Sequence, residues 1–274
     1  MVPTVELNDG ILMPRLGFGV YKIPDGETVA AVRAAFEAGY RSIDTATLYG
    51  NERGVGEAVR SSGLAREDVF VTTKLWNTDH GYDSARRAFD SSISELGLDY
   101  VDLYLIHWPV PAQDKYVETW KALEKIQADG AARAIGVSNF QIAHLNRLLD
   151  EADVAPAVNQ VEAHPRMQQG ELRNFHEQHG IVTEAWSPLA RGGELLETDV
   201  VRTVARKHGK TPAQAVLRWH IEMGHVAIPK SVSPQRIAEN IDVFDFRLDQ
   251  QDIAGFATLE KVERVGPEPD EVGA

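Results

Sequence analysis

Short apolar runs alternate with segments of helical periodicity along almost the whole chain. Apolar residues in 27–38 recur every three or four positions, which predicts a helix with one buried face that ends at Gly39. The same pattern predicts helices over 82–96 and 115–128, each followed by a glycine that favours termination. Between such segments we predict eight short strands, at 16–19, 41–44, 68–74, 101–107, 132–139, 156–162, 180–186 and 225–230.

This alternation indicates an α/β protein with a parallel sheet. Eight strand–helix units over about 250 residues are typical of a closed (β/α)8 TIM barrel. A doubly wound sheet is the alternative, and it would usually have a glycine-rich fingerprint between its first strand and first helix. The stretch "GFGVYKIPDG" does not match G-x-G-x-x-G opening a helix, so we favour the barrel.

Both ends of the chain have features outside the repeating pattern. In "VELNDGILMP", Asp9 and Gly10 separate two apolar runs, which predicts a β-hairpin. Because this hairpin precedes the first barrel strand, we expect it to close the barrel floor. The tail from about residue 262 to 274 is polar, acidic and rich in proline and glycine, so we expect a loop over the surface or the site. No linker divides the chain, and we expect residues 1–274 to form a single domain.

Composition excludes several classes of function. The chain has no cysteine, so disulfides, thiolate metal sites and thiol catalysis are ruled out. A formal net charge of −13 argues against nucleic acid and anionic membranes as partners. No apolar segment approaches the roughly 20 residues of a membrane span, and the N-terminal sequence lacks the features of a signal peptide. We therefore expect a cytoplasmic protein.

The predicted strand ends have an unusual set of side chains. In a barrel of this kind the carboxyl ends of the strands and the following loops form the active site. An isolated lysine at such an end usually marks the point where a strand reaches water. Here the ends also include an acid, a histidine, amides and a tryptophan: Asp44, Lys74, His107, Trp108, Ser138, Asn139, Gln160, Trp186, Ser187, Lys230 and Ser231.

Four residues near these ends suit acid–base chemistry. The phenol of Tyr49 ordinarily holds its proton at neutral pH, and a neighbouring Lys74 would lower its pKa while Asp44 holds the ammonium in place. Such a tyrosine can donate and accept a proton. A neutral His107 can donate a hydrogen bond to a carbonyl oxygen and orient it. These four residues are our candidate catalytic group.

Other chemistries lack their motifs. There is no G-x-S-x-G elbow and no H-E-x-x-H metal site, and we expect no bound metal. His176 and His179 are expected to be solvated on a helix. Redox chemistry at a carbonyl remains, which needs a nicotinamide cofactor. Amide and hydroxyl groups at 138–139 suit its carboxamide, although these two residues could equally cap the following helix.

At these residues the chain resembles the aldo-keto reductases, the NADPH-dependent (β/α)8-barrel oxidoreductases, along nearly its whole length. The motifs are "GFGVYK", "SIDTATLYGNE", "VFVTTKLW", "LYLIHWP", "IGVSNF", "AVNQVEAHP" and "IPKSVSPQRIAENIDVFDF". Within the family the chain is most similar to the prokaryotic 2,5-diketo-D-gluconic acid reductase branch, through "PAVNQ", "HGKTPAQAVLRWH" and "PDEV".

The resemblance implies roles for many positions. It assigns the catalytic tetrad to Asp44, Tyr49, Lys74 and His107. It implies NADPH contacts at Val20, Tyr21, Asp44, Ser138, Asn139, Gln160, Trp186, Ser187, Leu189, Lys230, Ser231, Val232, Arg236, Glu239 and Asn240. It implies a substrate pocket formed by Tyr21, Leu48, Tyr49, Trp76, His107 and Trp108. Ser233 stands where this branch often has an arginine, so part of the cationic clamp on the 2′-phosphate is expected to be missing.

The implied function is reduction of aldehydes or ketones, including dicarbonyls and keto-sugars, with Tyr49 as proton donor. An NADP(H)-binding regulatory subunit with little turnover is the alternative, and an aldolase-like barrel ranks below both. We expect a monomer that binds NADPH and a small carbonyl substrate. For the 2′-phosphate, Lys230 and Arg236 would meet at a helix starting near Ser233 and Pro234, unless Arg236 instead pairs with Glu239.

Overall fold

Eight parallel strands form one sheet in the computed structural model, which describes residues 2–273. The strands pair in chain order, from the first to the eighth. Their bounds are β3 (Phe18–Gly19), β4 (Ser42–Asp44), β5 (Phe70–Leu75), β6 (Val101–Ile106), β7 (Ala132–Ser138), β8 (Val158–Glu162), β9 (Val182–Trp186) and β10 (Val226–Ala227). Each overlaps a strand predicted from the apolar runs.

The sheet closes on itself between its first and last strands. Leu16 and Ala227 form a parallel bridge. The N–H of Gly17 donates to the carbonyl of Ala227 at 2.9 Å, and the N–H of Gly19 donates to the carbonyl of Pro229 at 3.1 Å. The prediction of a closed barrel is therefore confirmed. β10 is shorter than expected because Pro229 has no N–H to donate to a ladder.

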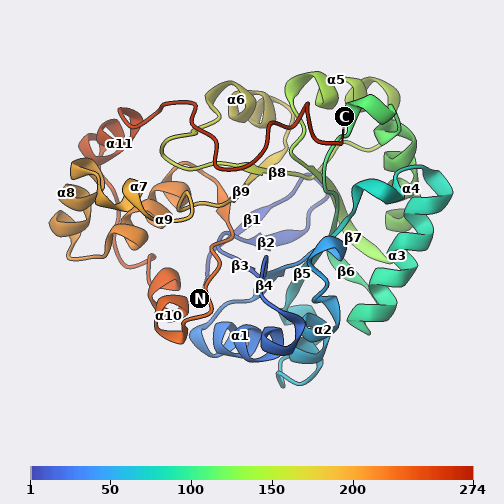
Figure 1. The fold of residues 1–274 in the computed structure, drawn as a ribbon, viewed down its shortest axis with the longest axis horizontal. Helices are drawn as coiled ribbons and strands as arrows, with labels where there is room; N and C mark the ends of the chain where they lie inside the picture. The colour runs from blue at the N-terminus through green and yellow to red at the C-terminus, as the bar shows by residue number, and fades with distance from the viewer. Residues whose placement is uncertain (1, 274) are drawn as a thin grey trace.

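Helices cover the outside of the barrel, as Figure 1 shows. Two of the predicted helix ends have the expected glycine in the left-handed conformation, Gly39 at φ 107° and Gly97 at φ 60°. The helices are α1 (Asp25–Ala38), α2 (Glu52–Arg60), α3 (Tyr82–Leu96), α4 (Tyr116–Ala128), α5 (Ile142–Glu151), α6 (Gly170–Gln178), α7 (Glu194–Glu197), α8 (Asp199–His208), α9 (Pro212–Glu222), α10 (Pro234–Ile241) and α11 (Gln250–Ala257). Within residues 2–273, none of them has the length and apolar character needed to span a bilayer.

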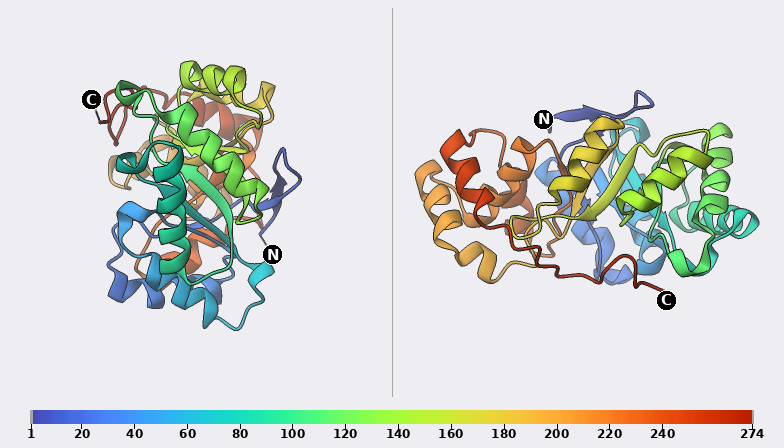
Figure 2. Two further views of the ribbon diagram at one scale, coloured as in Figure 1. Left: turned by 90° about the vertical axis from the view of Figure 1, so that its right-hand side faces the viewer. Right: turned by 90° about the horizontal axis from the view of Figure 1, so that it is seen from above.

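The N-terminal hairpin closes one end of the barrel, as predicted. Its strands β1 (Thr4–Glu6) and β2 (Leu12–Pro14) are antiparallel. Met13 is fully buried and belongs to a cluster with Leu103 and Leu105, from inside the barrel. The right-hand view of Figure 2 places this hairpin on the side of the molecule opposite residues 262–273. The other end of the barrel is thus left for a site.

Close packing between neighbouring strands explains one glycine in β7. A Cβ added to Gly136 would lie 2.6 Å from the carbonyl oxygen of Val158 and 2.8 Å from a methyl carbon of Leu105. Backbone cannot move aside as a flexible side chain can. Gly136 therefore allows β7 and β8 to approach each other at this level of the barrel.

We expect Gly136→Ala to destabilise the fold by about 1–3 kcal/mol, the usual cost of overpacking a filled interior. Gly26→Ala is the matched control, because a Cβ there meets no atom within 4 Å and the residue lies in helix α1. Alanine at position 26 should be neutral or slightly stabilising. Urea unfolding of both variants measures the difference, and equal stabilities would contradict the packing argument.

Candidate active site

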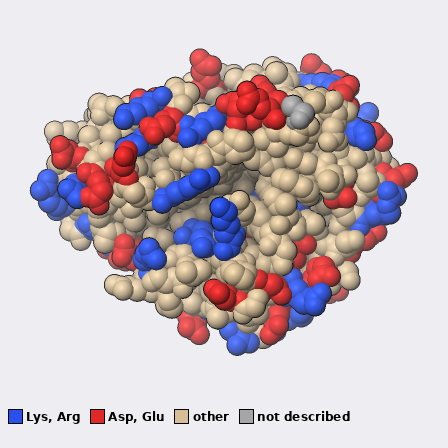
Figure 3. Space-filling view, viewed as in Figure 1, with Lys and Arg blue, Asp and Glu red and all other residues tan. Residues whose placement is uncertain are grey.

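The carboxyl ends of the barrel strands open into a cavity of about 730 Å³. Figure 3 shows the hollow at the centre of this face, with Lys and Arg side chains along one side of it. Most of the expected site residues line it: Tyr21, Asp44, Leu48, Tyr49, Trp76, His107, Trp108, Ser138, Asn139, Gln160, Trp186, Ser187, Leu189, Lys230, Ser231, Val232, Arg236, Glu239 and Asn240.

Two expected residues do not line the cavity. Val20 is fully buried in the core that the strands share with the helices. Its side chain is thus not available to a bound molecule. Lys74 is also fully buried, beneath the cavity rather than on its wall. The lysine is therefore not the solvated strand end that an isolated residue of this kind would suggest.

Lys74 forms a buried ion pair with Asp44. Its Nζ donates to Oδ1 of Asp44 at 2.6 Å and to the carbonyl of Thr45 at 2.8 Å. Burial alone would lower the pKa of Lys74, but the charges of Asp44 and Tyr49 outweigh burial and raise it. The ammonium lies 5.1 Å from the centre of the Tyr49 ring. A permanent positive charge therefore stands beside the phenol.

The turn that bears Tyr49 is held by its neighbours. Gly50 ends this turn in the left-handed conformation, at φ 64°. The amide of Asn51, which is fully buried, donates to two carbonyls of the loop after β3 at 3.0 and 2.9 Å. The hydroxyl of Thr47 donates to the carbonyl of Lys74 at 3.0 Å. These bonds fix the position of Tyr49 relative to β5.

The expected lowering of the Tyr49 pKa is wrong for the protein alone. Burial raises the pKa of the phenol to about 12, and the charge of Lys74 acts in the opposite direction without outweighing burial. The sequence suggested the charge but not the depth of burial. Tyr49 therefore holds its proton at neutral pH, as a proton donor must.

His107 has the neutral character that we expected. Burial and the charge of Lys74 hold its pKa well below the usual range. The ring lies between two tryptophans, with centres 5.2 Å from Trp76 and 6.4 Å from Trp108. A neutral imidazole in these surroundings can donate a hydrogen bond without carrying charge.

The polar residues at the next strand ends are tied to one another. The hydroxyl of Ser138 donates to the carbonyl of Gln160 at 2.8 Å. The amide of Asn139 donates to the carbonyl of His107 at 3.0 Å and accepts from Nε1 of Trp186 at 2.8 Å. Four strands are thereby connected at the floor of the cavity.

Ser138 and Asn139 do not cap the helix that follows them. The N-cap of α5 is Gln141, whose backbone N–H donates to Nδ1 of His144 at 3.1 Å. Asn139 has φ 64°, a left-handed conformation that turns the chain before the helix begins. The capping interpretation was therefore wrong.

Glu184 is a site residue that the sequence analysis missed. The amide nitrogen of Gln160 donates both to Oδ2 of Asp44 and to Oε2 of Glu184, each at 2.8 Å. Glu184 is fully buried, and burial together with the charge of Asp44 raises its pKa. Its signal in the sequence is a glutamate within the strand "GIVTEAW", in phase with Trp186.

The cationic side of the cavity surrounds the start of α10. Ser233 is the N-cap, accepting from the N–H of Arg236 at 3.4 Å, and Pro234 is the first residue of the helix. Glu239 accepts from the hydroxyl of Thr211 at 2.7 Å. The expected start of the helix is therefore confirmed. Among the described residues neither Arg236 nor Lys230 forms an ion pair, so the Arg236–Glu239 pairing is not observed.

Further lining residues were not predicted. Lys22 and Arg191 add positive charge to the cavity, and the C-terminal segment contributes to its wall. Arg191 follows β9 in a loop where it and Ala190 have positive φ. The remaining additional residues are Gly19, Pro188, Gly192, Leu196, Ala213, Ile228, Pro229, Gly266, Pro267 and Val272.

One of the two histidines expected to be solvated is buried. His176 hydrogen-bonds Asn159 at 2.9 Å and the hydroxyl of Thr183 at 2.8 Å. It lies on the face of α6 turned to the barrel, whereas His179 is exposed and stacks on Phe175. Across residues 2–273, no group of three or more His, Cys, Asp or Glu side chains is placed to hold a metal ion.

Comparison with known proteins identifies the class. Residues 15–261 match the model of the aldo/keto reductase family. The chain belongs to this family, so the resemblance found in the sequence is confirmed.

Relatives match over nearly the full length of both chains. The methylglyoxal reductase DkgA of Salmonella typhimurium is 53% identical over 99% of this chain and 98% of its own. The glyoxal reductase of Bacillus subtilis is 53% identical over 98% of this chain and 97% of its own. Among solved structures, a mutant of Gox0644 in complex with NADPH has a TM-score of 0.95 and 46% identity, covering both chains completely.

We expect Lys74→Met to reduce turnover by about 10²–10⁴-fold, the usual contribution of a general acid–base group. Asp44 would keep a buried charge without its partner, so the free energy of unfolding should also fall, by about 3–5 kcal/mol. Steady-state turnover and urea unfolding measure the two effects. Lys125→Met, which breaks an exposed pair with Asp129, is the control. A folded Lys74→Met enzyme with near-normal turnover would contradict a role for the lysine in proton transfer.

Proposed function

We propose that the protein is an NADPH-dependent reductase of small carbonyl compounds, with 1,2-dicarbonyls such as methylglyoxal and glyoxal as its substrate class. The observation that supports this most directly is one cavity that joins an acid–base group to unpaired cations. Tyr49 and His107 line the cavity above the Asp44–Lys74 pair, and Lys230 and Arg236 line it at another side. The names of the two reductases compared above support the dicarbonyl class.

The nicotinamide end of the cofactor fits the centre of the cavity. The nitrogen of the Gln160 side chain is occupied by two carboxylates, whereas its Oε1 accepts no hydrogen bond from the described residues. That oxygen is free to accept from the carboxamide of a nicotinamide. Trp186 lines the same cavity and offers an aromatic face to the ring. When bound, NADPH supplies the hydride that reduces the carbonyl carbon.

The phosphate end fits the start of α10. Lys230 and Arg236 lie at this junction, and the first N–H groups of a helix favour an anion. The protein as a whole has a net charge of −13, so only local cations can favour the 2′-phosphate. Ser231 and Asn240, which also line the cavity, add polar contacts around them.

Tyr49 is the proposed proton donor. The proton moves from its hydroxyl to the carbonyl oxygen as that oxygen gains negative charge. The phenolate left behind is stabilised by the ammonium of Lys74, which Asp44 holds in place at 2.6 Å. The pair therefore stabilises the tyrosine more once it has lost its proton than before, as catalysis requires.

His107 and the aromatic wall position the carbonyl. A neutral imidazole donates a hydrogen bond to the carbonyl oxygen without drawing a second proton into the reaction. Trp76, Trp108 and Leu48 line the cavity around the histidine. Their apolar surfaces exclude water and so strengthen the electrostatic effect of Lys74.

We further propose that residues 1–274 act as one domain and as a monomer in the cytoplasm. The monomer is supported by the composition of the site, because one chain provides both the tetrad and the cations of the cavity wall. A molecule assembled in this way needs no partner subunit to complete its site. A mass of two or more chains in light scattering would contradict the monomer.

The proposal is tested by following NADPH oxidation with and without methylglyoxal or glyoxal. Oxidation should require the carbonyl. Because Tyr49 holds its proton, reduction should persist between about pH 6 and 8, whereas oxidation of the product alcohol, which needs the phenolate, should rise with pH. Tight NADPH binding with no turnover of any carbonyl would instead support a regulatory, cofactor-binding protein.

Wild-type protein should bind NADPH more tightly than NADH by at least about tenfold, since a charge-assisted contact contributes about 1.5–3 kcal/mol. Arg236→Ala should weaken NADPH binding, less so at high salt, and leave NADH binding nearly unchanged. Arg206→Ala is the control, because Arg206 bonds Thr203 on α8 and is not part of the cavity wall. Fluorescence titration of both cofactors measures the effects. Equal affinities in the wild type would overturn the assignment of the 2′-phosphate site.

A further inference from the structure

The last residues of the chain form part of the wall of the cavity. After α11 the chain runs back across the mouth of the barrel towards α5 (Figure 1). We call residues 262–273 the C-terminal segment. It has no helix or strand of its own, yet Gly266, Pro267 and Val272 line the cavity. Its position must therefore be set by contacts with the barrel.

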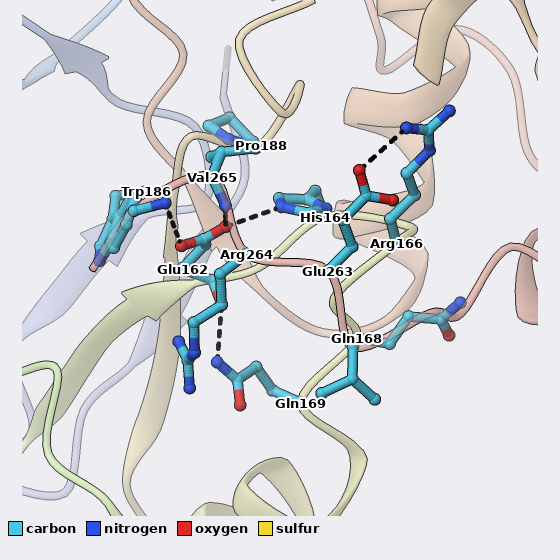
Figure 4. Close-up of polar contacts among 12 residues, drawn as sticks. Glu162, His164, Arg166, Gln168, Gln169, Trp186, Pro188, Glu263, Arg264 and Val265 are labelled. Atoms are coloured by element: carbon cyan, nitrogen blue, oxygen red, sulfur yellow. Dashed lines mark hydrogen bonds and ion pairs between the residues drawn. The ribbon is translucent and has the colours of Figure 1, made fainter. Parts of the chain in front are cut away.

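One buried carboxylate accepts hydrogen bonds from the backbone of this segment. Glu162 is the last residue of β8, and its side chain is 0% exposed. Its Oε1 accepts from the N–H of Val265 at 2.5 Å and its Oε2 from the N–H of Gly266 at 3.0 Å. Figure 4 shows this carboxylate between the segment and the ring of His164, whose Nε2 lies 3.0 Å from Oε1.

The three donors keep the carboxylate charged despite its burial. Burial alone would raise the pKa of Glu162, but the hydrogen bond from His164 and the N–H groups of Val265 and Gly266 lower it below its usual value. Hydrogen bonds to a charged group are strong, and a buried charge that loses its partners costs free energy. The carboxylate and the backbone of the segment therefore hold each other in place.

Other side-chain contacts of the segment are near the surface. Arg264 pairs with the exposed carboxylate of Glu268 inside the segment, and the exposed carboxylate of Glu263 lies 3.5 Å from the guanidinium of Arg166. The carbonyl of Arg166 also accepts from the N–H of Glu263 at 3.1 Å. Asp270, also exposed, lies 3.5 Å from His144 of α5. Exposed pairs contribute little to stability because water and salt screen them. Among the described side chains that contact the segment, Glu162 is therefore the one that is both fully buried and charged.

Gly266, which is bound to Glu162, packs against Trp186, and Trp186 lies beside Glu162 in the sheet. The two are register partners across β8 and β9. A Cβ added to Gly266 would lie 2.3 Å from Cη2 of Trp186 and 3.1 Å from Oε2 of Glu162. The segment therefore packs closely on the ring at the anchor itself, and the adjacent Pro267 lines the cavity.

We propose that Glu162 is a positioning residue that determines which carbonyl compounds the enzyme accepts, by holding Val265 and Gly266 so that the C-terminal segment narrows the cavity beside Trp186. The proposal rests on the proposed reductase function. Glu162 does not touch the reacting atoms. Its effect should fall on substrate binding and selectivity, while the Asp44–Lys74 pair and Tyr49 remain unchanged.

The test is Glu162→Gln, which keeps the size of the side chain but leaves one acceptor oxygen for two backbone donors. We expect hydrogen–deuterium exchange at Val265 and Gly266 to accelerate by at least about tenfold, as for the loss of one charged hydrogen bond. The KM for methylglyoxal should rise several-fold with kcat within about twofold, since only substrate binding is weakened. The kcat/KM of the bulkier phenylglyoxal should rise relative to that of methylglyoxal.

Glu268→Gln is the matched control, since it removes a carboxylate from the same segment at the surface. Its exchange rates and selectivity should equal those of the wild type. Unchanged exchange at Val265 and Gly266 in Glu162→Gln would overturn the proposal. A fall in kcat/KM of the same size for methylglyoxal and phenylglyoxal would also overturn it. So would a loss of NADPH affinity larger than the change in KM, because either result would indicate general damage to the site.

The test also covers a variant that does not fold and a wild-type protein that reduces no carbonyl. If Glu162→Gln does not fold, Val265→Pro is the alternative, because it removes the N–H that donates to Glu162 at 2.5 Å and leaves the carboxylate with its other partners. Faster exchange at Gly266 and the same shift in selectivity are then expected. The absence of either change would overturn the proposal. If the wild type reduces no carbonyl, the proposed function fails, and with it the effect on selectivity. The exchange measurement would still show whether Glu162 anchors the segment.

Discussion

The buried ion pair between Asp44 and Lys74 is the interaction on which the rest of the site depends. Two charges removed from water are tolerated only when hydrogen bonds satisfy them. Here Lys74 also donates to the carbonyl of Thr45, and the second oxygen of Asp44 accepts from Gln160. Each of these partners belongs to a different part of the barrel rim. The requirement to satisfy this one ion pair thus fixes two groups. The ammonium of Lys74 is held beside the phenol of Tyr49, and the amide of Gln160 is held at the cavity.

Charge in this protein acts locally. The chain is strongly acidic overall, yet its cavity has unpaired cations on one side and an ion pair at its floor. Screening over a Debye length of about 10 Å separates the cavity from the acidic surface. A protein can therefore repel polyanions such as nucleic acid and still bind a small phosphate-bearing cofactor. The same reasoning applies to Glu162, whose charge acts on the ring of His164 and two backbone N–H groups and not on the molecule at large.

Burial cannot be recognised in a short sequence motif, and it explains most of the differences between the predicted and the observed site. His176 was expected in water and is instead bonded to Asn159 and Thr183 inside the fold. The charge of Lys74 does act to lower the pKa of Tyr49, but the expected net lowering is wrong because burial raises that pKa by more. Ser138 and Asn139 have the composition of a helix cap, and tertiary contacts use them elsewhere.

The sequence alone determined the order of strands and helices, the closed barrel, the hairpin at its floor and the helix start at Ser233 and Pro234, because these follow from periodicity and local backbone preference. It also determined which strand ends have chemical groups, because parallel strands in a barrel end at one rim. Only the tertiary structure decided how these groups are paired: Glu184 joined to Asp44 through Gln160, and Glu162 joined to a backbone more than a hundred residues away. Such pairings depend on distances across the barrel and on the exclusion of water, and neither is written in the spacing of residues along the chain.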